Sequence, residues 1–343
     1  MRGHNCGPDR GGRHLRVGIV GAGISGLAAA YELSRSSHEV VVWERSGHVG
    51  GRIETTSVDG YVFDPGATTI APRGMAIEHV MLKEMDTSSL IHVHKPIYTH
   101  ESLRVIPGDP GRNTPRFTYR PGNDTLPKLL AAGLDVRTDS QIEEVARNRE
   151  GFIVRDDHYD ALILTAPLPQ TSALLWTLRE SRPVSNATYR RCLSVMLGFT
   201  RPTPDVPYHA LLDVEQRHPL TWICLESVKS PGRAPAGCCA IVAQMSPGYS
   251  QMQYDKHDQE IIDDVLIYTQ RLYGADFKDP AVARVRRWKY SQPEMVAPFE
   301  NVNQGHCKLV LAGDGLIAGR VESAFESGIK AARLVAGSKG KGL

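Results

Sequence analysis

Long apolar runs are missing from this chain of 343 residues, since no stretch approaches the roughly 18 to 20 consecutive residues that a membrane-spanning helix needs. An excess of one charge sign is missing too, because 40 basic and 38 acidic side chains give a formal net charge of +2. That balance gives no reason to expect a nucleic-acid groove or a binding surface for acidic membranes. We therefore expect a soluble, cytoplasmic protein that acts on a small-molecule substrate.

Cysteine is sparse and follows no recognisable pattern. The six cysteines are scattered, with no CxxC motif and a single adjacent pair, Cys238 and Cys239. This pattern favours reduced thiols over a disulfide framework. His92 and His94 lack a third ligand at recognisable spacing, so no metal site is expected. The chain also lacks GxSxG and HExxH, which excludes these two hydrolase signatures.

A glycine-rich turn is the most informative feature that is present. An apolar stretch, Leu15–Val20, leads into Gly21-Ala22-Gly23-Ile24-Ser25-Gly26, and an Ala- and Leu-rich segment follows. Gly21 allows a sharp turn, Gly23 has no side chain to block a pyrophosphate, and Gly26 lets a helix pack closely on a sheet. The helix N-terminus adds free N–H groups and partial positive charge. These residues predict a dinucleotide-binding turn between a strand and a helix.

An acidic residue stands where such a turn requires one. Glu44 follows the next predicted strand, Glu39–Trp43, and lies eighteen residues after Gly26. That spacing is typical of the carboxylate that binds the adenosine ribose hydroxyls. We expect Glu44, with Arg45 beside it, at the adenosine end of the ligand.

Two further motifs point to flavin rather than to nicotinamide. Gly50-Gly51-Arg52 offers backbone N–H groups and a guanidinium, which suit a pyrophosphate. Gly313-Asp314, at the end of a late apolar strand, can place a carboxylate on a ribityl hydroxyl. A helix beginning near Val321 would direct its N-terminal dipole at the flavin, whose reduced form carries negative charge. A nicotinamide-dependent dehydrogenase needs neither motif, so that alternative is disfavoured.

The order of elements predicts an α/β protein whose Rossmann domain opens and closes the chain, with an α+β domain built on a mixed antiparallel sheet inserted in it. Residues 1–14 are expected to form a disordered leader; 15–75, 120–167 and 294–337 the FAD-binding domain; and 76–119 and 168–293 the substrate domain. The predicted elements that bear on the site are strands at Leu15–Val20, Glu39–Trp43, Ile53–Val58, Tyr61–Phe63, Ile142–Val145, Ala161–Thr165 and Lys308–Ala312, and helices at Ile24–Arg35, Glu78–Met85, Asp258–Leu272 and Val321–Val335.

The motifs together resemble the FAD-dependent amine oxidase superfamily, and further stretches resemble its renalase branch, most closely the bacterial renalases. The stretches that carry the renalase resemblance are Asp64-Pro65-Gly66-Ala67, Thr165–Gln170 with Leu174-Leu175, Trp222 with Lys229–Arg233, Arg287–Pro293, and Ala312–Asp314 with Gly319–Gly328. The resemblance implies the two-domain glutathione-reductase-like fold with FAD bound non-covalently. Renalases oxidise the 2- and 6-dihydro isomers of NAD(P): hydride passes to flavin N5, and dioxygen then reoxidises the flavin to give hydrogen peroxide.

Each site residue follows from a motif or from the resemblance. The expected FAD-binding residues are Gly21, Ala22, Gly23, Ile24, Ser25, Gly26, Glu44, Arg45, Gly50, Gly51, Arg52, Gly66, Ala67, Ile142, Gly313, Asp314, Arg320, Val321 and Ala324. The expected substrate-binding residues are Thr68, Thr69, Trp222, Trp288 and Tyr290. Trp288 and Tyr290 alternate along a predicted strand and should share one face. No catalytic side chain is assigned, because the flavin itself is the hydride acceptor.

The chain departs from the renalase pattern at two places. Thr68-Thr69-Ile70 stands where the family usually has Gln and an aromatic residue, and Gly315 stands where bacterial members carry an aromatic residue. Both places lie near the flavin ring in the family, so both bear on the substrate. An amine oxidase, a desaturase of a biosynthetic pathway and a non-catalytic flavoprotein therefore stay open as alternatives. The oligomeric state is not indicated.

Overall fold

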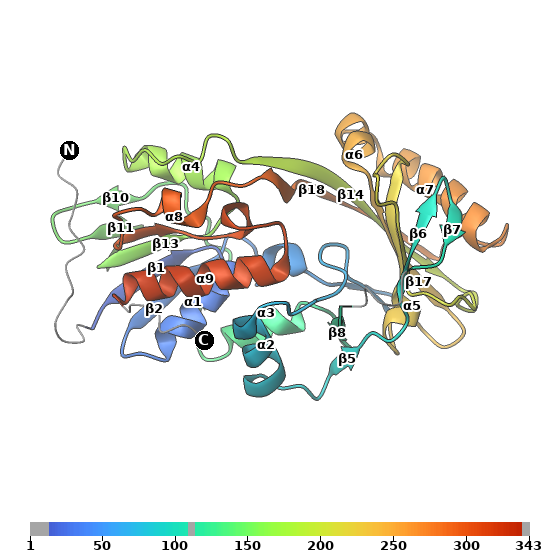
Figure 1. Cartoon of the computed structure of the whole chain (residues 1–343), viewed down its shortest axis with the longest axis horizontal. Helices are drawn as coiled ribbons and strands as arrows, with labels where there is room; N and C mark the ends of the chain where they lie inside the picture. Colours follow the sequence, from blue (N-terminus) through green and yellow to red (C-terminus); the bar gives the residue numbers. More distant parts are fainter. Residues whose placement is uncertain (1–13, 109–113, 338–343) are drawn as a thin grey trace.

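A five-stranded parallel sheet forms one end of the molecule (Figure 1), in a computed structural model that describes residues 14–108 and 114–337. Its strand order is β19-β13-β1-β2-β9, and every neighbouring pair is parallel. The strands are β1 (Arg16–Val20), β2 (Glu39–Trp43), β9 (Asp135–Arg137), β13 (Ala161–Leu164) and β19 (Leu309–Leu311). They come from the beginning, the middle and the end of the described chain, as the predicted α/β class requires.

Two helices pack against each other beside this sheet. Helix α1 (Ile24–Ser34) follows the glycine turn, and α9 (Val321–Val335) follows β19. A methyl group on Gly328 of α9 would lie 2.1 Å from the Ser25 carbonyl oxygen, so the two backbones are in close contact. The apolar strands β1 and β13 are buried almost throughout, as expected of parallel strands that are covered on both faces.

A seven-stranded mixed sheet forms the other end of the molecule (Figure 1). Its order is β18-β14-β17-β16-β15-β6-β7; β15 and β6 are parallel, and the other neighbours are antiparallel. The strands are β6 (Ile97–Glu101), β7 (Arg104–Ile106), β14 (Thr188–Phe199), β15 (Ala210–Leu212), β16 (Leu220–Leu225), β17 (Cys239–Met245) and β18 (Val282–Met295). The long strands β14 and β18 reach toward the parallel sheet (Figure 1).

Each sheet has its own hydrophobic core, which agrees with a two-part molecule. The remaining helices are α2 (Met75–His79), α3 (Thr125–Ala131), α4 (Leu168–Thr177), α5 (Glu226–Lys229), α6 (Pro247–Gln253), α7 (Asp258–Tyr273) and α8 (Phe299–Val302). The remaining strands are β3 (Thr56–Val58), β4 (Tyr61–Phe63), β5 (Leu90–His92), β8 (Phe117–Tyr119), β10 (Ala146–Arg147), β11 (Phe152–Val154) and β12 (Asp157–Tyr159).

Three predicted elements differ from the observed ones. The strand predicted at Ile53–Val58 begins only at Thr56, because Ile53 ends a short 3₁₀ helix, Gly51–Ile53, which follows the left-handed Gly50 (φ 113°) and includes the left-handed Gly51 (φ 57°). The helix predicted at Glu78–Met85 begins earlier, as α2, and continues as a π-helical turn at Val80–Glu84. The strand predicted at Ile142–Val145 is wrong, because Val145 exchanges hydrogen bonds with the Thr177 hydroxyl at the end of α4 instead of with a strand.

The cysteines partly match the expectation. Cys192, Cys224, Cys238 and Cys239 are free thiols. Cys307 is disulfide-bonded, so the prediction of reduced thiols is wrong there. Most of the predicted leader, residues 1–13, lies outside the described residues. Among the helices of the described chain, none has the length and apolar character that crossing a bilayer would need.

Candidate active site

The glycine turn leaves room at the N-terminus of α1. The Gly21 N–H donates to the Trp43 carbonyl at 2.8 Å, which extends the parallel pairing of β1 and β2 to the first residue of the turn. A methyl group on Gly26 would meet the Gly21 carbonyl oxygen at 1.9 Å, whereas one on Gly23 would have no atom within 4 Å. The Ser25 hydroxyl is buried and has no hydrogen-bond partner among the described residues. Open space, an unpaired hydroxyl and a helix N-terminus together fit a pyrophosphate.

Glu44 lies directly against this turn. One carboxylate oxygen accepts from the Ala22 N–H at 2.9 Å, and the other accepts from the Ser46 N–H at 2.9 Å and its hydroxyl at 2.6 Å. The Ser140 N–H donates to the Glu44 carbonyl at 2.7 Å, which brings the segment that carries Ile142 alongside. Ile142 is half-buried and Arg45 is exposed. Glu44 is therefore held at the glycine turn by two backbone N–H groups and the Ser46 hydroxyl.

Arg52 and Asp314 form a two-pronged ion pair across 262 positions of sequence, and both N–O distances are 2.7 Å. The Gly50 N–H donates to the Ala22 carbonyl at 2.9 Å, so this second glycine motif lies beside the first. Burial opposes the guanidinium charge, but the Asp314 carboxylate outweighs burial and raises the pKa of Arg52. The pair leaves Nε of Arg52 and further lone pairs of the carboxylate for a ligand.

Gly66 and Ala67 lie against the backbone of Arg52. The Ala67 N–H donates to the Arg52 carbonyl at 3.0 Å. A methyl group on Gly66 would be 2.1 Å from that same carbonyl oxygen and 3.3 Å from Cζ2 of Trp288. The Trp288 indole donates to the Ser194 hydroxyl at 3.1 Å and to the Pro65 carbonyl at 3.3 Å. Trp288 and Ser194 of the mixed sheet therefore meet the segments around Arg52 and Pro65 at Gly66.

The other predicted substrate residues have separate neighbours. Tyr290 lies in a stretch of β18 whose pairing with β14 is irregular. Its ring contacts that of Tyr189, whereas the Trp288 indole donates to Ser194 and Pro65. Trp222 pairs on β16 with Gln244 of β17, and its indole N–H is buried without a partner among the described residues. Thr68 is buried and Thr69 is half-buried.

Tyr189 is a site residue that sequence reasoning missed. Its hydroxyl would be 2.2 Å from a methyl group on Gly315, so Tyr189 fills the space beside that glycine. Its ring lies 5.9 Å from that of Tyr290, edge to face, and 5.8 Å from the Arg52 guanidinium. Burial raises the pKa of Tyr189 to about 12, so the phenol is neutral at physiological pH. An isolated tyrosine at the start of a strand carries no motif, and no local signal could have identified it.

Helix α9 contacts Gly313 at the end of β19. The Gly313 N–H donates to the Ser327 hydroxyl at 2.9 Å, which fixes the end of β19 against α9. Arg320, the residue before α9, is exposed and lies 3.9 Å from the Glu322 carboxylate. Val321 and Ala324 are half-buried in the first turn. Gly313 is thus held by the second turn of α9.

Family comparisons agree with this geometry. Residues 19–83 match the model of an NAD(P)-binding Rossmann-like domain, and residues 82–336 match that of the flavin containing amine oxidoreductases. The second match covers most of the chain. The protein belongs to the flavin containing amine oxidoreductase family. It is an FAD-dependent oxidoreductase, with the α/β fold that the sequence predicts.

Individual relatives of this flavoenzyme are distant. A mitochondrial protoporphyrinogen oxidase of Nicotiana tabacum is 42% identical over 66 residues, which is 19% of this chain and 13% of the relative. A 4,4'-diapophytoene desaturase of Staphylococcus aureus is 39% identical over 56 residues, 16% of this chain and 11% of the relative. Cyclohexylamine oxidase from Brevibacterium oxydans has a TM-score of 0.72 over 94% of this chain and 99% of its own, at 14% identity. The structural likeness shows the fold alone.

Proposed function

We propose that this flavoenzyme is a renalase-like oxidase. Its substrate class would be the 2- and 6-dihydro isomers of NAD(P), with hydride passing to flavin N5 and dioxygen as the final acceptor, giving hydrogen peroxide. One observation carries the proposal: ionisable side chains of the segments that meet at Gly66 are held in ion pairs, Asp64 with Lys229 and Arg233, and Arg52 with Asp314, which commits them to one another and not to proton abstraction. A dihydropyridine needs no base for hydride loss, because aromatisation drives the reaction.

We propose that FAD is held non-covalently along the residues described above. The glycine turn and the start of α1 would take the pyrophosphate, Glu44 the adenosine ribose, and Ile142 the adenine through its backbone. Arg52 would contribute positive charge near the pyrophosphate, and Asp314 would accept from a ribityl hydroxyl. Bound FAD supplies the hydride-accepting chemistry, and these residues orient it.

The substrate side of this proposal draws on the mixed sheet. Trp288 would form the wall beside Gly66, Tyr290 would contribute beside Tyr189, and Thr68, Thr69 and Trp222 would line other parts of the substrate side. The domain boundaries follow the same division: 15–75, 120–167 and 294–337 would form the FAD-binding domain, and 76–119 and 168–293 the substrate domain.

A second candidate is an amine oxidase. The edge-to-face pair of Tyr189 and Tyr290 favours it, because aromatic walls bind a substrate amine well. The structural likeness to cyclohexylamine oxidase and the sequence likeness to a desaturase keep amine oxidation and desaturation among the alternatives. A non-catalytic flavoprotein is the remaining possibility.

The test is an anaerobic absorbance measurement on the purified yellow protein mixed with borohydride-generated dihydro-NAD(P) isomers. We expect rapid bleaching of the flavin bands, then recovery and one equivalent of hydrogen peroxide when air is admitted. A flavin that stays oxidised with these isomers would contradict the renalase-like substrate. Primary and secondary amines would then be tested in the same way, and bleaching by none of them would favour the non-catalytic flavoprotein.

A further inference from the structure

Every carbonyl from Pro65 to Thr68 accepts a hydrogen bond from a side chain. The Gln244 amide donates to Pro65 at 2.9 Å and to Gly66 at 2.7 Å. The Asn123 amide donates to the Ala67 carbonyl at 2.9 Å, and the Lys229 ammonium donates to the Thr68 carbonyl at 2.9 Å. This segment lies outside helices and strands. Its backbone is therefore ordered by side chains that come from elsewhere in the chain.

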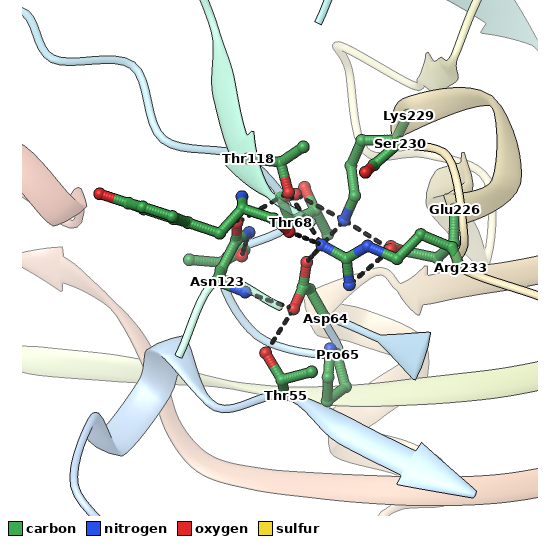
Figure 2. A network of polar contacts seen from close by, with 12 residues as sticks. Thr55, Asp64, Pro65, Thr68, Thr118, Asn123, Glu226, Lys229, Ser230 and Arg233 are labelled. Carbon is green, nitrogen blue, oxygen red and sulfur yellow. Dashed lines mark hydrogen bonds and ion pairs between the residues drawn. The ribbon is translucent and has the colours of Figure 1, made fainter. Parts of the chain in front are cut away.

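The lysine in this set belongs to a buried ion cluster, which we define as Asp64, Glu226, Lys229 and Arg233 (Figure 2). All four side chains are 0% exposed. One Asp64 oxygen accepts from both Lys229 and Arg233 at 2.8 Å, and the other accepts from the Thr55 hydroxyl at 2.6 Å. The Lys229 ammonium also lies 2.6 Å from the carboxylate of Glu226, which stands three positions earlier on α5.

The cluster holds two carboxyl groups and two basic groups, so its formal charges balance. Burial opposes ionisation of Asp64, but Lys229 and Arg233 outweigh it and lower the pKa of the carboxyl group. Burial likewise opposes the charge on Lys229, and the two carboxylates outweigh it and raise the pKa of the ammonium group. Burial also opposes ionisation of Glu226 and raises the pKa of that carboxyl group, although Lys229 and Arg233 offset part of the effect. Two acids and two bases thus share one fully buried site. Such a cluster costs several kcal/mol of desolvation per ion, so it is a poor means of gaining stability alone.

The cluster does fix the position of two chain segments relative to each other. It joins α5, which follows β16 of the mixed sheet, to the segment that follows β4 and contacts Arg52. We propose that Lys229 and Gln244 are positioning residues: they fix the peptide planes of 65–68, and so set how this segment faces the flavin ring. The proposal rests on the proposed contact of Gly66 and Ala67 with FAD.

The decisive pair of variants is Lys229→Met and the double variant Lys229→Met with Glu226→Gln. The single variant removes the bond to the Thr68 carbonyl and leaves an excess negative charge. The double variant lacks the same bond but restores the charge balance, because Asp64 and Arg233 remain as a pair. If Lys229 acts by positioning the backbone of 65–68, the double variant should regain the thermal stability that the single variant loses. The flavin midpoint potential of the double variant should nevertheless stay shifted from the wild-type value.

We expect both variants to bind FAD, because the adenosine end of the site is untouched. Their two-electron reduction equilibrium should change by at least tenfold, which is about 30 mV of midpoint potential. With a substrate that reduces the wild-type flavin, kcat should fall at least tenfold, with a smaller change in KM. Gln244→Leu, which removes two carbonyl bonds without touching a charge, should shift the potential in the same way.

Arg182→Met is the matched control, since it removes another buried arginine, bonded to the Val302 and Leu309 carbonyls at the far end of the parallel sheet. It should lower stability and leave the midpoint potential unchanged. A double variant that recovers the wild-type potential would show that the cluster acts through its charge alone and would overturn the proposal. So would a wild-type potential in Gln244→Leu. Because the potential needs no enzymatic substrate, these outcomes are separate from failure of the renalase-like function.

Discussion

At the scale of single residues, Gly23 and Gly26 stand in the same turn but have opposite surroundings. An added methyl group at Gly23 meets nothing within 4 Å, and Gly23 has a φ of −74° that alanine adopts readily. We therefore expect Gly23→Ala to fold with a stability within about 0.5 kcal/mol of wild type. FAD affinity should fall at least tenfold, since the methyl group would enter the proposed pyrophosphate space.

The measurement is an FAD titration of the apoprotein together with urea unfolding. Gly248→Ala in α6 is the control, because a methyl group there also meets no atom within 4 Å. Gly248 is far from the glycine turn in the sequence and does not belong to the parallel-sheet part of the molecule. Unchanged FAD affinity in Gly23→Ala would place the pyrophosphate elsewhere.

Asp314 offers a second prediction at this scale. Its carboxylate is 6% exposed and holds Arg52 through two bonds. Asp314→Ala should weaken FAD binding about 10- to 100-fold, since a hydrogen bond to a charged group contributes roughly 1.5–3 kcal/mol. Flavin released on gel filtration and the apoprotein titration would both report the loss. Asp258→Ala, which removes an exposed carboxylate paired with Arg287, should retain full FAD; full FAD in Asp314→Ala would contradict the assignment.

At the scale of elements, the contact between α1 and α9 places the glycine turn. Gly328 is helical, and replacing a helical glycine with alanine ordinarily stabilises a protein by about 0.5–1 kcal/mol. At Gly328 the methyl group would be 2.1 Å from the Ser25 carbonyl, so the two helices would have to separate. We expect Gly328→Ala to destabilise the apoprotein by about 1–3 kcal/mol in urea unfolding. Stability equal to or above wild type would show that the helices can move apart at little cost.

The long strands β14 and β18 act at the same scale. Their pairing has irregular register where Tyr189 and Trp288 lie, and there the two strands reach Gly315 and Gly66 respectively. The mixed sheet thus contributes aromatic side chains directly to the proposed flavin pocket. Fold class alone would not reveal this, because the contribution depends on where the two strands shift register.

At the scale of the whole molecule, acid stability should depend on a buried histidine between strands of the mixed sheet. His209 is 1% exposed, and its Nδ1 lies 2.6 Å from the Lys95 carbonyl. Burial, with a smaller contribution from the charges of Lys229 and Arg116, lowers the pKa of His209 to about 4. In the unfolded chain this histidine has its ordinary pKa near 6.5. Between pH 6.5 and 4 the unfolded state therefore binds more protons at this position than the folded state does.

The folded state therefore loses stability as pH falls from about 6.5 to about 4, by roughly 3 kcal/mol for this group. His209→Asn, which keeps a donor for the Lys95 carbonyl, should show a correspondingly flatter dependence in urea unfolding at pH 7, 6, 5 and 4. His48→Asn, at an exposed histidine, should follow the wild-type curve. Parallel curves for wild type and His209→Asn would contradict the prediction.

Much of the nucleotide-binding half was predictable from sequence because its signals are local. The strand at Glu39–Trp43 and the helix at Val321–Val335 match their predicted bounds, and the glycine turn lies between a strand and a helix as expected. Glu44 contacts the turn through Ala22, and Arg52 and Asp314 lie together. Errors came where the backbone departs from regular geometry, as at Gly50 and Gly51, or where a side chain replaces a strand partner, as Thr177 does for Val145.

The sequence by itself determined the fold class, the cofactor and the places where the nucleotide motifs lie, because each depends on residue types at fixed short spacings. Only the tertiary structure decided what surrounds Gly66 and Gly315. Tyr189 fills the space beside Gly315, and Lys229 reaches Asp64 across 165 positions. Neither contact has a local signal, because each depends on the packing of a mixed sheet against loops of the parallel one, and chain segments so far apart meet only when both have folded.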